Sequence, residues 1–98
     1  MDKINIAEKL SLLSEHWSPK VVAEINDHQV KLVKLQGEFV WHTHQAEDEL
    51  FLVLKGRLRM KFRDREICVD PGELVVVPRG VEHCPSAGGE RTREATWI

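Results

Sequence analysis

Two histidines separated by a single residue, His42 and His44, lie at and just beyond the end of a segment, residues 38–43, whose aromatic and β-branched side chains favour a β-strand. Successive side chains along a strand point to opposite faces of the sheet, so residues two apart point the same way. We therefore expect both imidazoles to face the same side of a sheet. The rest of the chain is expected to supply the strands that hold them there.

A carboxylate and a third imidazole extend this pair. Glu49 follows a polar break at residues 45–48 and begins the apolar run 50–54, so a hairpin can fold its carboxylate back beside the two rings. His83 ends a later segment, residues 72–83, that contains a Pro/Gly turn. Three neutral imidazole nitrogens and one carboxylate form a mixed N/O donor set that suits Fe, Mn, Ni or Zn. An octahedral ion held by four such groups keeps positions open for water or substrate.

Two segments of the sequence resemble the motifs of the cupin family. Residues 37–56 resemble the first motif, with its His-x-His, a Glu after four further residues and a closing Gly. Residues 72–83 resemble the second motif, with its Gly, Pro-x-Gly and final His. The resemblance implies a site for a divalent transition metal whose ligands are His42, His44, Glu49 and His83.

The match to the family departs from its usual pattern at two positions. Gly37 stands one residue closer to the first histidine than the commonest spacing, and Ala87 stands where the second motif usually has Asn. Neither departure removes a ligand. The two motifs occur in the right order and together cover about half of the chain, so the pair is far more specific than either motif alone.

The composition limits the class of protein and its partners. The chain has 98 residues, enough for one domain, residues 1–98, that is small enough to gain from oligomerisation. Its 14 Lys and Arg against 16 Asp and Glu give no electrostatic case for binding nucleic acid or an anionic membrane. The N-terminus carries acidic residues early and no sustained apolar run, and no later run is long enough to span a bilayer. We expect a cytoplasmic protein in which Cys68 and Cys84 do not form a disulfide.

Residues 1–18 are expected to form a short helical segment. Asn5 is placed as an N-cap with an acidic residue three positions later, and apolar residues then recur at helical spacing as far as Trp17. Pro19 ends this pattern because it disfavours a helical conformation in the residue before it. The remaining residues, 19–98, are expected to form the barrel.

Short strands separated by turn residues follow one another closely. The expected strands are residues 21–25, 30–35, 38–43, 49–54, 57–63, 66–69 and 73–77. This spacing indicates an all-β sandwich or barrel, and the resemblance implies the double-stranded β-helix, or jelly roll, of the cupins. In the tail only residues 92–98 can form a further strand, which is short or atypical for the family. Either the barrel is open at one edge, or a partner strand closes it.

The apolar run 50–54 is hydrophobic on both faces, so it needs a cover on each side. Phe51 and Val53 share the parity of the predicted carboxylate ligand and are expected to face the barrel interior. The outward residues Leu50, Leu52 and Leu54 are expected to pack against a second subunit in a homodimer. The alternative is that the N-terminal helix covers them.

Several other polar residues have an ordinary structural interpretation. His16 and His28 have no partners in sequence, and Glu47 and Asp48 belong to a solvated acidic loop. Cys84 is adjacent to a predicted ligand and so points to the opposite face of an extended chain, where it cannot use that histidine as a base.

A stripe of basic residues at alternate positions of residues 55–65 is typical of a solvated face. Steering of an anionic substrate is the alternative interpretation of this stripe.

The resemblance leaves the activity open, because cupins include isomerases, lyases, dioxygenases and non-catalytic binding proteins. The expected inward residues are apolar and the chain has no Tyr, which favours chemistry done by the metal and its water. The leading hypothesis is a small metal-dependent enzyme that acts on a small sugar or organic acid, with no catalytic residue assigned. The rival is a non-catalytic module that binds or senses a metal or small molecule. A third possibility is a partial barrel with little activity.

Overall fold

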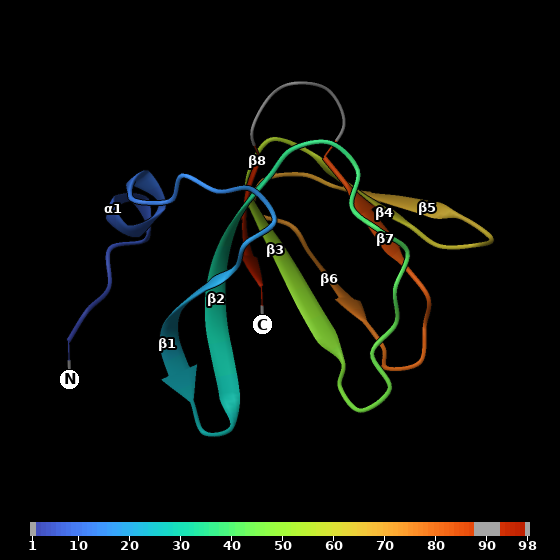
Figure 1. Cartoon of the computed structure of the whole chain (residues 1–98), viewed down its shortest axis with the longest axis horizontal. Coiled ribbons are helices and arrows are strands. Elements are labelled where there is room, and N and C mark those ends of the chain that lie inside the picture. The colour runs from blue at the N-terminus through green and yellow to red at the C-terminus, as the bar shows by residue number, and fades with distance from the viewer. Residues whose placement is uncertain (1, 88–92, 98) are drawn as a thin grey trace.

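Two antiparallel sheets make up the body of the molecule (Figure 1). The computed structural model describes residues 2–87 and 93–97, with side chains described for 2–87. Within these residues the strands are β1 Lys20–Ile25, β2 His28–Leu35, β3 Glu49–Lys55, β4 Leu58–Lys61, β5 Glu66–Val69, β6 Leu74–Val77, β7 Cys84–Ser86 and β8 Arg93–Trp97. The larger sheet has the order β1-β2-β8-β3-β6, and the smaller has the order β5-β4-β7. The predicted jelly-roll fold is confirmed.

Residues with a positive φ form the tight turns between several strands. Asn26 (φ 53°) begins the connection from β1 to β2, and asparagine tolerates this left-handed conformation better than most side chains. Gly72 (φ 83°) lies in the turn before β6, where its N–H donates to the Val53 carbonyl at 2.8 Å. The turn signals therefore lie where the sequence predicted breaks between strands.

The hydrophobic core lies between the two sheets. Phe51 and Val53 are each 1% exposed, and Leu58 and Met60 on the facing sheet are fully buried. Their neighbours Val33, Leu35, Val69, Val77 and Ala87 complete the cluster. The alternation that predicted inward faces for β3 and β4 is confirmed. Burial of each large side chain contributes about 1.5–3 kcal/mol.

The helix is shorter than predicted. Helix α1 spans Ile6–Ser11, and the Asn5 side chain caps it by accepting a hydrogen bond from the Glu8 N–H at 3.0 Å. Trp17 lies outside the helix with φ 57°, because its N–H donates to the Lys34 carbonyl at 2.8 Å and its indole packs against the core. These contacts with β2 override the helical spacing of the apolar residues.

The predicted strand at residues 38–43 is wrong as a continuous element. This crossing segment leaves β2 of the larger sheet, passes beside β7 of the smaller sheet and returns to β3 of the larger sheet. Among the described residues its bridges are Glu38 with Ser86 and His42 with His83. A segment that passes from one sheet to the other and back has no continuous strand partner. Its main neighbour, β7, was not predicted, because a three-residue strand containing Pro85 offers no strand pattern.

The C-terminal tail enters the middle of the larger sheet. Strand β8 pairs with β2 on one side, where Val33 is opposite Ala95, and with β3 on the other, where Phe51 is opposite Trp97. The chain's own strand therefore fills the middle of the larger sheet, as the prediction of a strand in the tail allowed. Residues 92 and 98 of the predicted strand lie outside the described residues.

The outward face of β3 continues onto the edge strand β6. Leu50 is opposite Val76 and Leu52 is opposite Leu74, and the β6 residues remain 48% and 56% exposed. Helix α1 packs against β2 and lies beside Leu54. The helix therefore covers one end of this face and leaves the other end open.

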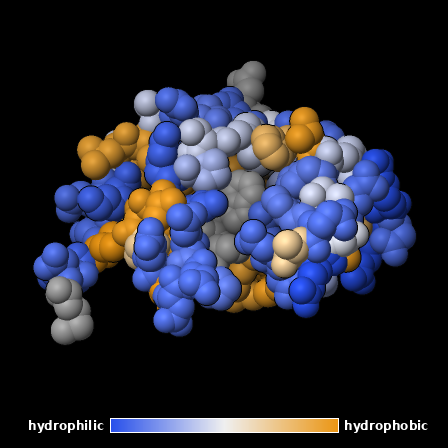
Figure 2. Space-filling model, turned by 60° about the horizontal axis from the view of Figure 1, so that its bottom comes forward, coloured by the Kyte–Doolittle hydropathy of each residue, from blue (hydrophilic) through white to orange (hydrophobic). Residues whose placement is uncertain are grey.

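One face of the molecule is shown by hydropathy in Figure 2. On this face hydrophobic groups are prominent on the left, beside the N-terminal helix, and the right half, which carries the smaller sheet, is mainly hydrophilic apart from smaller hydrophobic patches. None of the helices among the described residues has the length and apolar character needed to cross a membrane.

Candidate metal centre

The four predicted ligands come from three separate parts of the chain. His42 and His44 lie on the segment that crosses between the sheets, Glu49 is the first residue of β3, and His83 immediately precedes β7. His42 and His83 exchange two backbone hydrogen bonds, from each N–H to the other carbonyl, at 3.0 and 2.9 Å. Directly opposite residues of an antiparallel pair project to the same face, so these two imidazoles are neighbours.

The Glu49 carboxylate lies between two of the imidazoles. Its Oε2 is 3.1 Å from His44 Nε2, and its Oε1 is 3.2 Å from His83 Nε2. The third ring, His42, has its centroid 4.3 Å from that of His83. One ligand atom from each of the four residues lies within 4.8 Å of every other. The structure therefore brings all four predicted site residues together.

Backbone carbonyls orient two of the imidazoles. His42 Nδ1 is 2.9 Å from the Val40 carbonyl oxygen, and His83 Nδ1 is 2.9 Å from the Val81 carbonyl oxygen. A carbonyl can only accept a hydrogen bond, so Nδ1 is the donor in each of these contacts. The other nitrogen, Nε2, then lies on the opposite side of each ring from its carbonyl partner. Histidines that bind metals are commonly fixed in this way by a partner on the other ring nitrogen.

The donor chemistry of the cluster suits a divalent transition metal. Imidazole nitrogens and a carboxylate oxygen are ligands that Fe, Mn, Ni and Zn accept. One such atom from each residue lies within 4.8 Å of the others. The cluster is therefore compatible with a metal ion.

The site is buried on one side and open on the other. The His83 side chain is 1% exposed and that of Glu49 12%, whereas His44 is 43% exposed. The Phe51 ring packs against His83 from the interior, with the two centroids 6.4 Å apart. A small molecule can therefore reach the cluster from the side of His44.

A cleft of about 900 Å³ adjoins this open side. His44 and Glu49 form part of its wall, together with charged residues of β1, β2 and their turn and of the loops before β3 and after β6. These charged residues are Glu24, Asp27, Lys31, Glu47, Asp48 and Arg79. Apolar residues, including Leu50 and Val76, also line the cleft. The cleft thus combines charged and apolar groups and lies next to two of the four clustered side chains.

The residues with an ordinary structural interpretation lie outside the cluster. His16 forms a bridge with Lys34, and His28 begins β2. Asp48 accepts a hydrogen bond from the Arg79 backbone N–H at 2.9 Å, and Glu47 is exposed. Among the neighbouring acidic residues 47–49, Glu49 is thus the one that contacts the imidazoles.

The Cys84 thiol contacts groups other than the His83 imidazole. Its Sγ is 3.5 Å from a Glu38 carboxylate oxygen and 3.5 Å from the Phe39 carbonyl oxygen. Burial raises the pKa of this thiol, and the Glu38 carboxylate raises it further. An un-ionised, fully buried thiol is a poor nucleophile, which agrees with its predicted structural role. Both cysteines are free.

The basic stripe of residues 55–65 makes specific contacts that the sequence analysis missed. Lys61 is paired with Glu38 at 3.2 Å, and Arg63 is paired with Glu82 at 2.7 Å. The hydrogen bond from Arg63 lowers the pKa of the Glu82 carboxyl. The alternating pattern of a strand shows which side chains point outward, but not which acidic residue each outward cation contacts. The sequence feature that could have pointed to the Arg63 contact is that Glu82 directly precedes a predicted ligand.

Comparison with known families identifies the fold family. The family model described as the cupin domain matches residues 29–98 of this chain. The chain belongs to the cupin family. The match includes both segments on which the sequence resemblance rested, and it extends from β2 through β8.

Solved structures agree with this assignment. The cupin is similar to a cupin-2 domain containing protein from Shewanella frigidimarina NCIMB 400, with 49% identity, 96% of this chain and 90% of that chain covered, and a TM-score of 0.92. It is also similar to protein NMB1881 from Neisseria meningitidis, with 30% identity, 98% and 96% coverage, and a TM-score of 0.84.

Among curated proteins, the cupin is similar to the uncharacterised protein YdbB of Bacillus subtilis (strain 168). The two are 41% identical over 63 residues, which are 63% of this chain and 56% of YdbB. The match thus spans less than two thirds of that relative.

Proposed function

We propose that this cupin is a small metal-dependent enzyme, of the isomerase, lyase or dioxygenase type, that acts on a small sugar or organic acid. A divalent transition metal, Fe, Mn, Ni or Zn, would be held by His42, His44, Glu49 and His83. The observation that carries this proposal is the convergence of three imidazoles and one carboxylate within 4.8 Å. The hydrogen bonds from two Nδ1 atoms to backbone carbonyls support it, because they fix the orientation of the two rings and use Nδ1 rather than Nε2.

Some residues of the chain would hold the metal, and others would control how water and substrate reach it. A divalent ion there is only partly neutralised by one carboxylate, so when bound it supplies a Lewis acid that can polarise a carbonyl or activate dioxygen. Phe51 and the buried side of His83 exclude water from the interior of the site. His44 lies at the border of the cleft, whose charged side chains would meet a hydrophilic substrate as it enters.

A non-catalytic module that binds or senses a metal or small molecule is the second candidate. It is favoured by the apolar packing around His83, where Phe51 supplies no acid or base. Catalysis by such a site would depend on the ion and on groups that line the cleft.

Elemental analysis of untagged protein, followed by a substrate screen, tests the proposal. We expect metal to be bound, and we expect turnover that requires it and disappears in His44→Ala while the fold is retained. Metal binding without turnover of any sugar or organic acid would favour the binding module. Equal and negligible metal content in the wild type and in His44→Ala would refute the metal-dependent enzyme and the metal-binding form of the module.

We further propose a homodimer in which the outward faces of β3 and β6 pack against a second copy. The partly exposed residues Leu50, Leu52, Leu74 and Val76 support this, because they form one apolar strip that α1 leaves uncovered. Leu74→Glu should convert the dimer to a monomer in light scattering, and Val21→Glu, on the distant strand β1, should not. A wild-type mass equal to one chain would refute the dimer.

We also propose the domain organisation and the location of the protein. Residues 1–98 would form a single cupin domain, with the helical segment 1–18 packed on the barrel 19–98. The two free cysteines support a cytoplasmic location, since a reducing compartment keeps thiols unpaired.

A further inference from the structure

Arg63 makes an unusually complete set of contacts for an exposed cation. Its Nη2 and Nε donate to the two carboxylate oxygens of Glu82, at 2.7 and 3.1 Å. Its guanidinium carbon also lies 3.8 Å from the centre of the Trp41 ring. The residue sits in the β4–β5 turn, which the hydrogen bond from the Phe62 N–H to the Arg65 carbonyl closes at 2.7 Å.

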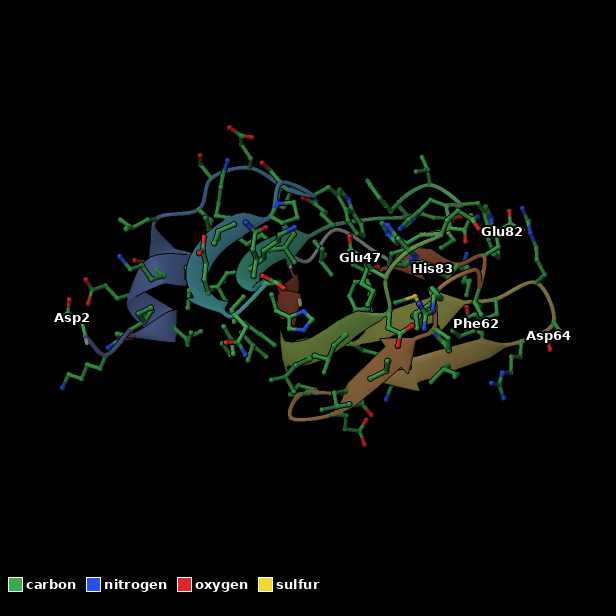
Figure 3. All side chains as sticks on the ribbon, turned by 90° about the horizontal axis from the view of Figure 1, so that it is seen from below. Asp2, Glu47, Phe62, Asp64, Glu82 and His83 are labelled. Atoms are coloured by element: carbon green, nitrogen blue, oxygen red, sulfur yellow. The ribbon has the colours of Figure 1, made fainter. Side chains whose placement is uncertain are left out.

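The two partners of Arg63 directly precede two of the clustered histidines. Trp41 precedes His42, and Glu82 precedes His83. Adjacent side chains in an extended chain project to opposite faces, so both partners lie on the side away from the imidazoles. Figure 3 shows this for one of them, with Glu82 at the periphery and His83 toward the interior.

The backbone pairing between these segments is short. His42 and His83 form an isolated bridge of two hydrogen bonds, and no continuous ladder of the described residues extends it. Two more bonds, from the Phe39 N–H to the Pro85 carbonyl and from the Ala87 N–H to the Gly37 carbonyl, lie on either side of the second bridge, which joins Glu38 to Ser86. The Arg63 contacts add a side-chain link to this short backbone pairing, next to the two imidazoles.

We propose that Arg63 is a positioning residue that ties the Trp41 and Glu82 side chains together and so holds His42 and His83 at the spacing required for metal binding. This inference rests on the proposed metal site. The Arg63 and Glu82 side chains are 61% and 45% exposed, and exposed ion pairs contribute little to overall stability. The effect of Arg63 is therefore local to the bridge, and it reaches the metal through the two histidines.

The chain contains a closely matched control. Arg57, at the other end of β4, pairs with Asp70 at 2.7 Å, and the two side chains are 63% and 47% exposed. The Arg57 pair thus has the same length and nearly the same exposure as the Arg63 pair, but neither of its members adjoins a clustered histidine. Arg57→Met and Arg63→Met each remove an exposed ion pair of the same length at one end of β4, and only Arg63→Met also removes a second hydrogen bond and the contact with the indole.

Two measurements on the full chain test the proposal. The first is cobalt(II) affinity, with its visible absorption spectrum. Partners behind metal ligands typically change affinity about 10–100-fold, so we expect binding about tenfold weaker in Arg63→Met and unchanged in Arg57→Met. The second is amide hydrogen exchange of His42 and His83 in metal-free protein. We expect faster exchange of these two amides in Arg63→Met only.

Conservative variants separate positioning from a general loss of folding. Arg63→Lys keeps the charge but cannot form the bidentate pair and stack on the indole, so it should rescue only part of the affinity. Glu82→Gln should reproduce part of the loss of cobalt affinity seen in Arg63→Met. Combining the two substitutions should lower the affinity little further than Arg63→Met alone, because both remove the same ion pair. If Arg63→Met fails to fold, Glu82→Gln and Arg63→Lys carry the same comparison.

The outcomes distinguish this inference from the proposed function. Wild-type affinity and unchanged exchange in Arg63→Met would overturn the role of Arg63 and leave the metal site standing. Equal weakening by Arg57→Met would also overturn it. If the wild-type chain binds no cobalt, the proposed metal site is overturned. The proposed effect of Arg63 on metal binding is then overturned as well, even if the amides of His42 and His83 exchange faster in Arg63→Met.

Discussion

Replacing His44 by alanine should abolish the stabilisation that a bound metal provides and leave the metal-free protein nearly unchanged. The His44 side chain is 43% exposed, so its removal opens no cavity in the core. The contrast is His83, which is 1% exposed and whose truncation would remove packing as well as a donor atom. His44→Ala is therefore the variant that isolates binding.

The size of the effect follows from linkage. A metal present at about 100 times its Kd stabilises the folded state by about 2.7 kcal/mol. If loss of one of four donors weakens binding about 100-fold, the same metal concentration provides only about 0.4 kcal/mol. The difference of about 2.3 kcal/mol corresponds to about 9–18 °C in Tm for a domain of this size.

Scanning calorimetry with and without metal measures this difference. We expect the metal-induced rise in Tm to be nearly lost in His44→Ala, while the metal-free Tm values of the two proteins agree within a few degrees. Because the cluster includes one carboxylate and three imidazoles, lowering the pH should also reduce the rise in Tm as ligands become protonated. An unchanged metal-induced rise in His44→Ala would refute the assignment of this side chain as a ligand.

Three further predictions follow from burial and charge. Iodoacetamide should label the exposed Cys68 in the folded protein and should reach Cys84 only on unfolding, since burial shields that thiol and raises its pKa; mass spectrometry showing equal rates would contradict this. Phe51→Ala should cost about 3–5 kcal/mol in urea unfolding because the side chain is 1% exposed, and a loss below about 1 kcal/mol would show that the ring is not in the core. The hydrogen bond from Lys61 lowers the pKa of Glu38, so the contribution of this pair is complete above the ordinary glutamate pKa and is lost as the pH falls through the lowered value. Glu38→Gln should therefore make the acid-side decline in Tm shallower, and an identical decline in both proteins would count against the pair.

The crossing segment shows how far local pattern extends. Residues 38–43 were predicted to be a strand, and they are an extended connection held at two bridges. The two-residue repeat still brought His42 and His44 to the same site, because extended chain alternates its side chains whether or not it has a strand partner. The prediction of a continuous strand was therefore wrong. The prediction that the two imidazoles face the same side was correct, because it depended only on the alternation of side chains.

The contacts of Arg63 show where local pattern ends. Alternation correctly placed the basic side chains of the β4 segment outside the core, but it interpreted them as solvated. The pairing of Arg63 with Glu82 joins residues 19 positions apart in sequence. Only the fold brings those positions together, so no periodicity within either segment could reveal the contact.

The sequence by itself determined which faces are apolar, where the turns lie and, through the two cupin-like motifs, which four side chains are the candidate ligands. Phe51 and Val53 point inward, as the sequence predicted, because side chains two residues apart on a strand lie on the same face. Tertiary structure alone decided that His83 pairs with His42, that β8 enters between β2 and β3, and that Trp17 leaves the helix for the core. These features depend on which distant segment satisfies a backbone or side-chain group, and that choice is made by the packing of the whole chain.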